Sequence, residues 1–221
     1  MTTSQISLSN LLKSSWQTFK NNALVFTALS VFATLSGMYT TDMGARMLTA
    51  ESGYTLFAPA THNLFALVIA YIIWFFSYYF FTVLSVKAVY NTKLTENNFT
   101  FNFKNFLKFW ATAAISLLIV SIGLFLLVVP GIIFLLALTF ACYIVVDKPD
   151  TTIIQALKQS SLITKGHRWR LLGIIALFFA PLILMSVSLL FEFLQILVIP
   201  LFTICLAHMY KQLLESKNSA V

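Results

Sequence analysis

The sequence predicts an all-α protein that crosses a membrane several times. Of its 221 residues, 59% are hydrophobic and only 10% are charged, whereas a soluble domain carries about 25% charged residues. So few charges cannot cover a water-facing surface of this size. Long runs contain no charged residue at all: Ala23–Tyr39, Ser52–Val86, Phe109–Val146, Leu171–Phe191 and Phe193–Tyr210. Because a helix needs about 20 apolar residues to cross a bilayer, we interpret residues 1–221 as one transmembrane domain.

These runs predict six transmembrane helices in three hairpins. The first hairpin covers about residues 22–41 and 63–89, and the last covers 171–191 and 193–210, joined near Glu192. The middle run, Phe109–Val146, is 38 residues long and therefore too long for one span. Pro130-Gly131 lies inside it, and Pro interrupts a helix while Gly permits a sharp reversal. We expect a tight hairpin folded there, with a kinked or re-entrant helix as the alternative.

The basic residues assign an orientation to these spans. With six spans, thirteen of the 14 Lys and Arg residues fall on one side and only Arg46 on the other. Cytoplasmic loops carry the excess of Lys and Arg in membrane proteins. We therefore expect cytoplasmic N- and C-termini, and five or seven spans would break this agreement.

Each cytoplasmic segment before a hairpin has the pattern of a helix lying on the membrane surface. In the first, one face carries Leu8, Leu12, Trp16 and Phe19. In the second, the stripe is Phe99, Phe103, Phe106, Leu107 and Trp110. The third, residues 151–165, aligns Ile153, Leu157 and Ser160, with Asp150 or Thr151 as the expected cap and Gly166 at its end. The basic residues expected to face lipid are Lys13, Lys20, Lys104, Lys108, Lys158 and Arg168.

The order of these elements suggests a threefold internal repeat. Each unit comprises one interfacial helix and one hairpin, at about residues 6–90, 97–146 and 150–212. The first and third units also share four identical residues in register. Leu12, Lys13, Ser15 and Lys20 align with Leu157, Lys158, Ser160 and Lys165.

The chain offers no recognisable catalytic or metal-binding constellation. Spans 1 to 5 have no Asp, Glu, Lys or Arg in their middles, and intramembrane ionisable groups are the usual mark of ion-coupled transport. No GxSxG, HExxH or P-loop pattern occurs. Three His and seven acidic residues are scattered along the chain. We therefore expect no enzyme activity, no cofactor and no metal, with His62 and His208 as interfacial polar residues and Cys142 and Cys205 as small buried or lipid-facing side chains.

The aromatic residues of the second span have a simple interpretation and a functional one. Lipid-facing bulk and interfacial belts explain them most simply. A passage or pocket for an apolar substrate is the alternative. The residues concerned are Trp74, Phe75, Phe76, Tyr78, Tyr79, Phe80 and Phe81.

The second half of the chain carries a distinctive series of motifs. These are Val128-Val129-Pro130-Gly131-Ile132-Ile133, then Asp147-Lys148, then Ala156–Thr164 with its Ser160-Ser161 pair, then a basic Trp/Arg cluster. The series resembles the YciC-like family of uncharacterised bacterial inner-membrane proteins, and the membrane domain fused to some glycerophosphodiester phosphodiesterases.

The resemblance implies a multi-pass protein of the bacterial inner membrane with six spans. Its signature and structural positions are Pro130, Gly131, Asp147, Ser160, Ser161, Lys165, Gly166, Trp169 and Arg170. Asp147 is expected to cap or pair with Arg168 and Arg170, Lys165-Gly166 to end the interfacial helix, and Trp169 to anchor the fifth span. The phosphodiesterase domain of the fused relatives has no counterpart in these residues, so that activity does not transfer.

The sequence is compatible with two functions. The first is a non-catalytic membrane protein whose basic cytoplasmic face, with its net charge of +7, binds anionic lipid or a membrane partner, including a second copy. The alternative is a transporter or exporter of a lipid-like or weakly polar solute. Nucleic acid is not an expected partner, because the basic residues flank membrane spans.

Overall fold

The described part of the chain is helical throughout. The computed structural model describes residues 8–49, 60–91, 94, 101–185 and 190–218, and these residues contain helices and no strand. The elements are α1 (Leu8–Asn21), α2 (Ala23–Thr49), α3 (Ala60–Tyr90), α4 (Phe103–Leu126), α5 (Val128–Leu138), α6 (Ala141–Asp147), α7 (Ile153–Thr164), α8 (Arg168–Met185) and α9 (Leu190–Asn218). The predicted all-α class is confirmed.

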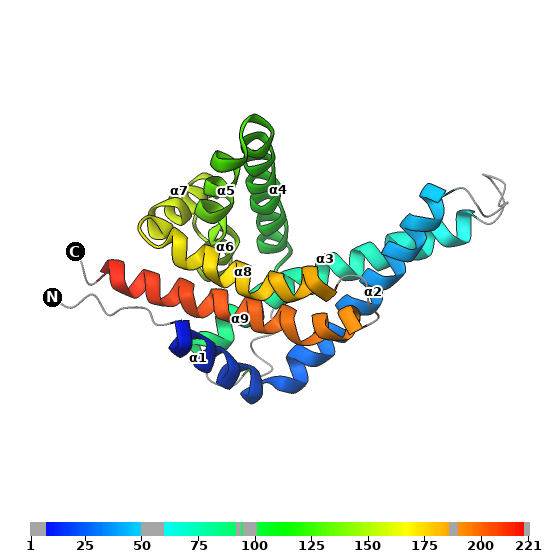
Figure 1. Cartoon of the computed structure of the whole chain (residues 1–221), viewed down its shortest axis with the longest axis horizontal. Coiled ribbons are helices and arrows are strands. Elements are labelled where there is room, and N and C mark those ends of the chain that lie inside the picture. The colour runs from blue at the N-terminus through cyan, green and yellow to red at the C-terminus, as the bar shows by residue number, and fades with distance from the viewer. Residues whose placement is uncertain (1–7, 50–59, 92–93, 95–100, 186–189, 219–221) are drawn as a thin grey trace.

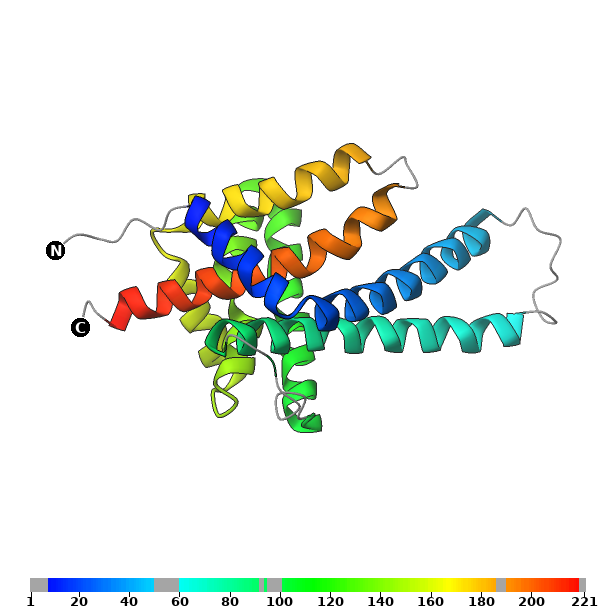
Figure 2. The ribbon, with the colours of Figure 1, turned by 90° about the horizontal axis from the view of Figure 1, so that it is seen from below.

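The helices run in two main directions. The α2–α3 hairpin, α8 and α9 follow the long axis of the molecule, whereas α4 runs across that axis in both views (Figures 1 and 2). The short helices α1 and α7 lie on opposite sides of α9. The three predicted hairpins are therefore not parallel to one another in this structure.

Four helical stretches of the described chain are long and apolar enough to cross a membrane. They are Val68–Tyr90 in α3, Phe103–Leu126 in α4, Val128–Asp147 across α5 and α6, and Leu194–Lys217 in α9. The apolar stretch Ala23–Gly37 in α2 is shorter, and α8, the predicted fifth span, is not among the four. Length and composition thus make this a membrane protein.

The middle hairpin reverses direction three residues before the expected Pro130-Gly131 turn. Leu127 is extended, with φ −159° and ψ 137°, and it separates α4 from α5. Pro130 is the third residue of α5, where the amide hydrogen that it lacks would have no partner within the helix. The chain therefore reverses at Leu127 and is not one helix kinked at Pro130.

Glycine allows the two arms of this hairpin to approach closely. A Cβ atom added at Gly131 would lie 2.5 Å from the side chain of Leu124 and 2.6 Å from its backbone nitrogen. A Cβ atom added at Gly123 would lie 2.8 Å from Phe134 and 3.0 Å from the Cα of Gly131. Helices in lipid associate through such small-residue contacts, because lipid supplies no hydrophobic force between them. The role of Gly131 is thus to permit contact between arms rather than to form the turn.

The predicted second interfacial helix is not a separate element. Phe103–Trp110 form the first two turns of α4, which continues without a break to Leu126. Asn102 caps the start of α4 by accepting a hydrogen bond from the amide of Lys104 at 3.0 Å. Phe99, the first residue of the predicted stripe, lies outside the described residues.

The first and third predicted amphipathic helices form as α1 and α7, and their position on the membrane surface remains a prediction. In α1 the buried residues are Leu11, Ser15 and Phe19, while Leu8 and Trp16 are exposed. The predicted stripe of α1 is therefore divided, because Phe19 packs inside the protein while Leu8 and Trp16 stay exposed. The predicted repeat remains a prediction: α1–α2–α3 and α7–α8–α9 share one order of elements, and the middle unit has no separate leading helix.

The ends of α7 are set by a capping box and a glycine. Thr152, and not Asp150 or Thr151, is the N-cap, because its side chain accepts from the amide of Gln155 while the Gln155 side chain accepts from the amide of Thr152. Gly166 follows the last turn with φ +91°, a conformation that is energetically unfavourable for residues with a Cβ atom. The predicted ending at Lys165-Gly166 is confirmed.

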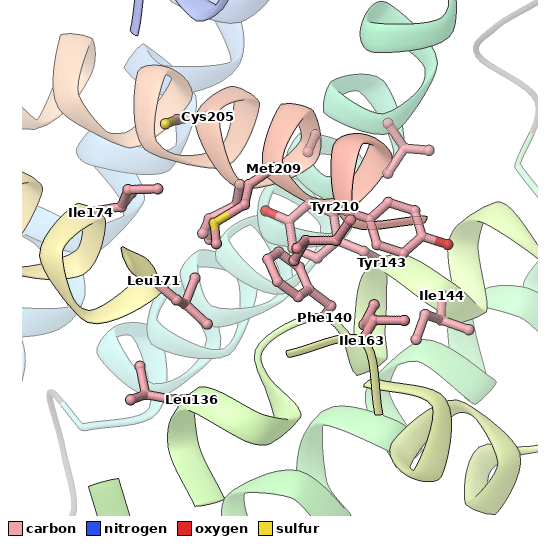
Figure 3. Close-up of a cluster of buried hydrophobic side chains, with 14 of the residues drawn as sticks. Leu136, Phe140, Tyr143, Ile144, Ile163, Leu171, Ile174, Cys205, Met209 and Tyr210 are labelled. Carbon is pink, nitrogen blue, oxygen red and sulfur yellow. The ribbon is translucent and has the colours of Figure 1, made fainter. Parts of the chain in front are cut away.

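The main core surrounds the C-terminal half of α9 (Figure 3). Cys205, Met209, Tyr210 and Leu213 of α9 are buried there. The side chains that pack around them come from α1, α3, α5, the α5–α6 junction, α6, α7 and α8: Leu11, Val86, Leu136, Phe140, Tyr143, Ile144, Val145, Ala156, Ile163, Leu171 and Ile174. Every one of these elements is therefore positioned by contact with the same cluster.

We predict that Gly131→Ala destabilises the protein by about 1–3 kcal/mol, the usual cost of forcing extra atoms into a packed contact. The matched control is Gly173→Ala in α8, where an added Cβ atom meets nothing within 4 Å. Thermal unfolding in detergent micelles, followed by circular dichroism, measures both. Equal melting temperatures for the two variants would show that the α4–α5 contact is not tight.

Candidate functional site

Helix α1 is amphipathic and is fixed to α9 by both apolar and polar contacts. Leu11 and Phe19 are buried. The hydroxyl of Thr18 lies 2.9 Å from Nε2 of His208 on α9. Because this contact joins residues 190 apart in sequence, the position of α1 depends on the tertiary fold. His208 thus helps to join two helices, and its expected position at the membrane interface remains a prediction.

The corner between α1 and α2 is closed by Asn22. Its side-chain nitrogen donates to the carbonyl of Thr18 at 3.1 Å, and its side-chain oxygen accepts from the amide of Leu94 at 2.8 Å. One buried side chain therefore links the end of α1 to the segment after α3. The C-terminal end of the basic helix α1 is thus held by both polar contacts.

An apolar groove of about 360 Å³ lies between α1, α8 and α9. We call it the α1 groove; it is lined by Leu12, Ser15, Trp16, Leu177, Phe178, Val198 and Leu201. Ser15 is the one hydroxyl among these lining residues, and it donates to the carbonyl of Leu11 at 2.7 Å. Because that hydroxyl is already paired, the groove suits an apolar ligand.

A basic and aromatic stripe borders this groove on α1. Lys13, Trp16 and Lys20 are all exposed and are spaced i, i+3 and i+7, which places them along one face of a helix. The ammonium group of Lys20 lies 5.3 Å from the centroid of the Trp16 ring, a cation–π distance. We call these three residues the basic stripe. Trp16 belongs both to the stripe and to the lining of the groove.

The other predicted lipid-facing basic residues differ in their availability. Lys104 and Lys158 are exposed. Lys108 is half-buried and donates to the carbonyl of Pro149 at 2.5 Å, so it ties α4 to the segment before α7. Arg168 is also half-buried, and its buried Nε has no hydrogen-bond partner among the described residues. Lys13, Lys20, Lys104 and Lys158 are therefore the predicted residues that can meet a lipid head group directly.

Asp147, expected to cap or pair with Arg168 and Arg170, has a different partner. The hydroxyl of Tyr210 donates to its Oδ2 at 2.9 Å. The bond joins the end of α6 to the C-terminal half of α9. The carboxylate therefore has a structural role that sequence spacing did not reveal, because Tyr210 follows Asp147 by 63 positions.

The Ser160-Ser161 pair contains one structural residue. Ser160 is fully buried, and its hydroxyl donates to the carbonyl of Ala137 in α5 at 2.7 Å. Ser161 is only half-buried. Ser160 therefore joins α7 to α5, which explains its presence without a ligand.

The junction between α7 and α8 faces outward. Lys165, Gly166 and Arg170 are exposed, and Trp169 is 86% exposed at the start of α8. Such a Trp beside basic residues has the composition of a membrane interface. Anchoring of the fifth span by Trp169 remains a prediction.

Sequence reasoning missed Thr203 of α9, which links this helix to α3 and α6. Ser85 of α3 donates to its hydroxyl at 3.1 Å, that hydroxyl donates to the carbonyl of Pro200 at 3.0 Å, and Tyr143 of α6 donates to its backbone carbonyl at 3.2 Å. Lys211, farther along α9, reaches the carbonyl of Val89 at 3.3 Å. A hydroxyl within a long apolar run was the available signal.

The aromatic residues of α3 divide between two environments. Tyr79 and Phe81 are buried, whereas Trp74, Phe75, Phe76 and Tyr78 are exposed. Tyr79 packs against Phe106 and Phe109 of α4, with ring centroids 5.2 and 5.3 Å away. Tyr79 therefore joins α3 to α4, and contact of the exposed aromatic residues with lipid remains a prediction.

Within the described chain, no group of three or more His, Cys, Asp or Glu side chains is placed to hold a metal ion. Cys142 and Cys205 are free thiols, the first half-buried and the second buried. Comparison with protein-family models, curated proteins and solved structures finds no match to this chain. The arguments for function therefore rest on the residues described above.

We predict that Ser160→Ala lowers the free energy of unfolding by about 1 kcal/mol, the usual net contribution of a hydrogen bond, because the carbonyl of Ala137 loses its side-chain donor. Ser161→Ala is the matched control and should change stability by less than about half of that. Denaturant unfolding in mixed micelles gives both values. The assignment fails if Ser161→Ala is the more destabilising change.

Proposed function

We propose that this chain is a non-catalytic integral membrane protein that binds anionic lipid through its basic helices. One observation carries the proposal: exposed apolar side chains accompany exposed Lys residues on each basic segment. Trp16 lies near Lys13 and Lys20 on α1, Phe103 and Leu107 flank Lys104 on α4, and Ile154 and Leu162 flank Lys158 on α7. This combination is typical of helices at the surface of a membrane with anionic lipids.

The packed centre supports binding over transport. The cluster around α9 contains fully buried Phe140, Ile144, Met209 and Tyr210, which fill the space among α5, α6, α8 and α9 (Figure 3). A transporter, including one for a lipid-like or weakly polar solute, needs a site near the middle of the membrane that opens alternately to each side. Tight apolar packing at this point favours a fixed scaffold.

The proposal includes the topology expected from the sequence: six spans in a bacterial inner membrane, with both termini in the cytoplasm, in a protein of the YciC-like family. It is supported by the arrangement of two hairpins. The end of α3, the start of α8 and the end of α9 point toward the termini (Figure 2), and they carry Lys87, Arg168 and Lys217. In the structure α4 lies across the direction of these helices (Figures 1 and 2), and helices lying across that direction cannot cross the same membrane. Six spans therefore require the α4–α5 hairpin to take a different direction in the bilayer.

We predict that cysteines introduced at Ser216 and Ser52 react with a membrane-impermeant maleimide from opposite sides of the inner membrane. Ser216→Cys should label only in inverted vesicles, and Ser52→Cys only in intact spheroplasts. Leu127→Cys reports on the middle hairpin, and six spans require its labelling from the spheroplast side. Labelling of the Ser52→Cys and Ser216→Cys variants from the same side would contradict the topology. Absence of labelling in the Leu127→Cys variant would indicate that the middle hairpin is re-entrant.

We further predict that anionic lipid remains bound to the protein in native mass spectrometry after mild detergent extraction. Changing Lys13, Lys104 and Lys158 together to Glu should remove it. Each Lys near an anionic surface contributes about 1 kcal/mol, so the affinity should fall by a factor of roughly 100 or more. The same three positions changed to Arg provide the matched control, because the charge is kept.

Unchanged retention in the Glu variant, or equal retention of zwitterionic lipid, would contradict the proposed function. Circular dichroism melting of both variants distinguishes loss of binding from loss of folding. A co-purified small solute in place of lipid would instead favour the transport alternative, which vesicle flux assays would then test.

A further inference from the structure

The α1 groove and the basic stripe together have the two parts that a phospholipid site needs. The groove is apolar, and its volume of about 360 Å³ lies within the range of about 300–1,000 Å³ that is usual for ligand sites. The stripe supplies two exposed ammonium groups beside it. Because Trp16 contributes to both, the apolar and the charged parts are continuous.

We propose that the α1 groove holds an acyl chain of an anionic phospholipid whose phosphate is bound by Lys13 and Lys20. This inference rests on the proposed lipid-binding function and adds a defined site to it. A phosphate carries the charge complementary to the stripe. The ring of Trp16 then packs at the level where the chain meets the head group, as Trp does at membrane interfaces.

The position of the groove along α8 fits an acyl chain. Arg168 begins α8, and Leu177 lies nine residues further along the same helix. At 1.5 Å per residue, this separation is about 14 Å. The groove wall at Leu177 and Phe178 is therefore well removed from the basic start of α8. Among the lining and bordering residues described above, the only basic ones are those of the stripe on α1.

The lining of the groove and the charge beside it favour a lipid as the occupant. The groove is lined almost entirely by apolar side chains, and its volume is about 360 Å³. The two exposed ammonium groups of the stripe lie at its border. A single apolar chain attached to a phosphate is the occupant that matches both the apolar lining and the positive charge.

The contacts of α1 show why this site stays in place. Leu11 and Phe19 point into the protein, and Thr18 is joined to His208. The opposite side of α1 therefore keeps Lys13, Trp16 and Lys20 outward. A bound lipid would cover the exposed part of Trp16, which is 41% exposed in the chain alone.

The test uses Trp16 as a reporter of lipid contact. The other Trp residues, Trp74, Trp110 and Trp169, are changed to Phe, and the full chain is reconstituted in mixed vesicles of phosphatidylglycerol and phosphatidylcholine. Bromine atoms are placed on the acyl chains of one lipid at a time, because they quench indole fluorescence on contact. Trp16 should be quenched more strongly when phosphatidylglycerol carries the bromine.

Two sets of variants separate the head-group contact from the groove. Lys13→Gln and Lys20→Gln should each reduce the preference for phosphatidylglycerol by about fivefold. Val198→Phe fills the groove and should reduce quenching by either lipid. Its matched control is Leu197→Phe, at an exposed neighbouring position that does not line the groove. If Val198→Phe unfolds the protein, Leu177→Phe on the outer wall replaces it.

Equal quenching by the two brominated lipids would overturn the inference, as would identical quenching in the Val198→Phe and Leu197→Phe variants. These results are distinguishable from failure of the proposed function. If native mass spectrometry still shows anionic lipid that the Lys13, Lys104 and Lys158 Glu variant loses, lipid binding stands and the groove does not hold it. If neither experiment detects a preference for anionic lipid, both proposals fail.

Discussion

The packing of helices around the C-terminal half of α9 positions every site described above. Lipid provides no hydrophobic force that drives one helix onto another, so close packing and hydrogen bonds between helices must do so. In α9 these bonds involve Thr203, His208, Tyr210 and Lys211, which reach α3, α6 and α1. Such bonds contribute about 0.6 kcal/mol each on average in membrane proteins. Their number and their spread over several helices therefore matter more than any one of them.

The middle hairpin also depends on close contact between helices, but glycines rather than hydrogen-bonding side chains provide that contact. It has no charged residue beyond its first two turns, and its apolar tip is exposed, with Phe125 at 93%. Its arms are held by the close approach of Gly123 and Gly131 rather than by polar side chains. A hairpin closed in this way can keep its shape while it presents apolar surface to lipid. Its direction across the α2–α3 hairpin distinguishes it from the other two pairs (Figures 1 and 2).

The basic residues acquire different roles once the helices are packed. Lys13 and Lys20 remain exposed beside an apolar groove, whereas Lys108 and Lys211 donate to backbone carbonyls. Net charge alone treats these four residues alike. Only the first pair combines free ammonium groups with apolar surface, which is the combination that favours a phospholipid over a soluble anion.

Composition and apolar run length determined the helical class and the membrane character, because a bilayer permits only a few backbone structures. Local spacing also determined the end of α7, since Gly166 adopts φ +91° at that position. The partners of Asp147, Ser160 and Thr18 came only from the tertiary structure, because they lie 63, 23 and 190 positions away. The face of α1 that is buried was likewise decided by packing on α9. Apolar periodicity identifies an amphipathic helix, but neighbouring helices choose which of its apolar residues they cover.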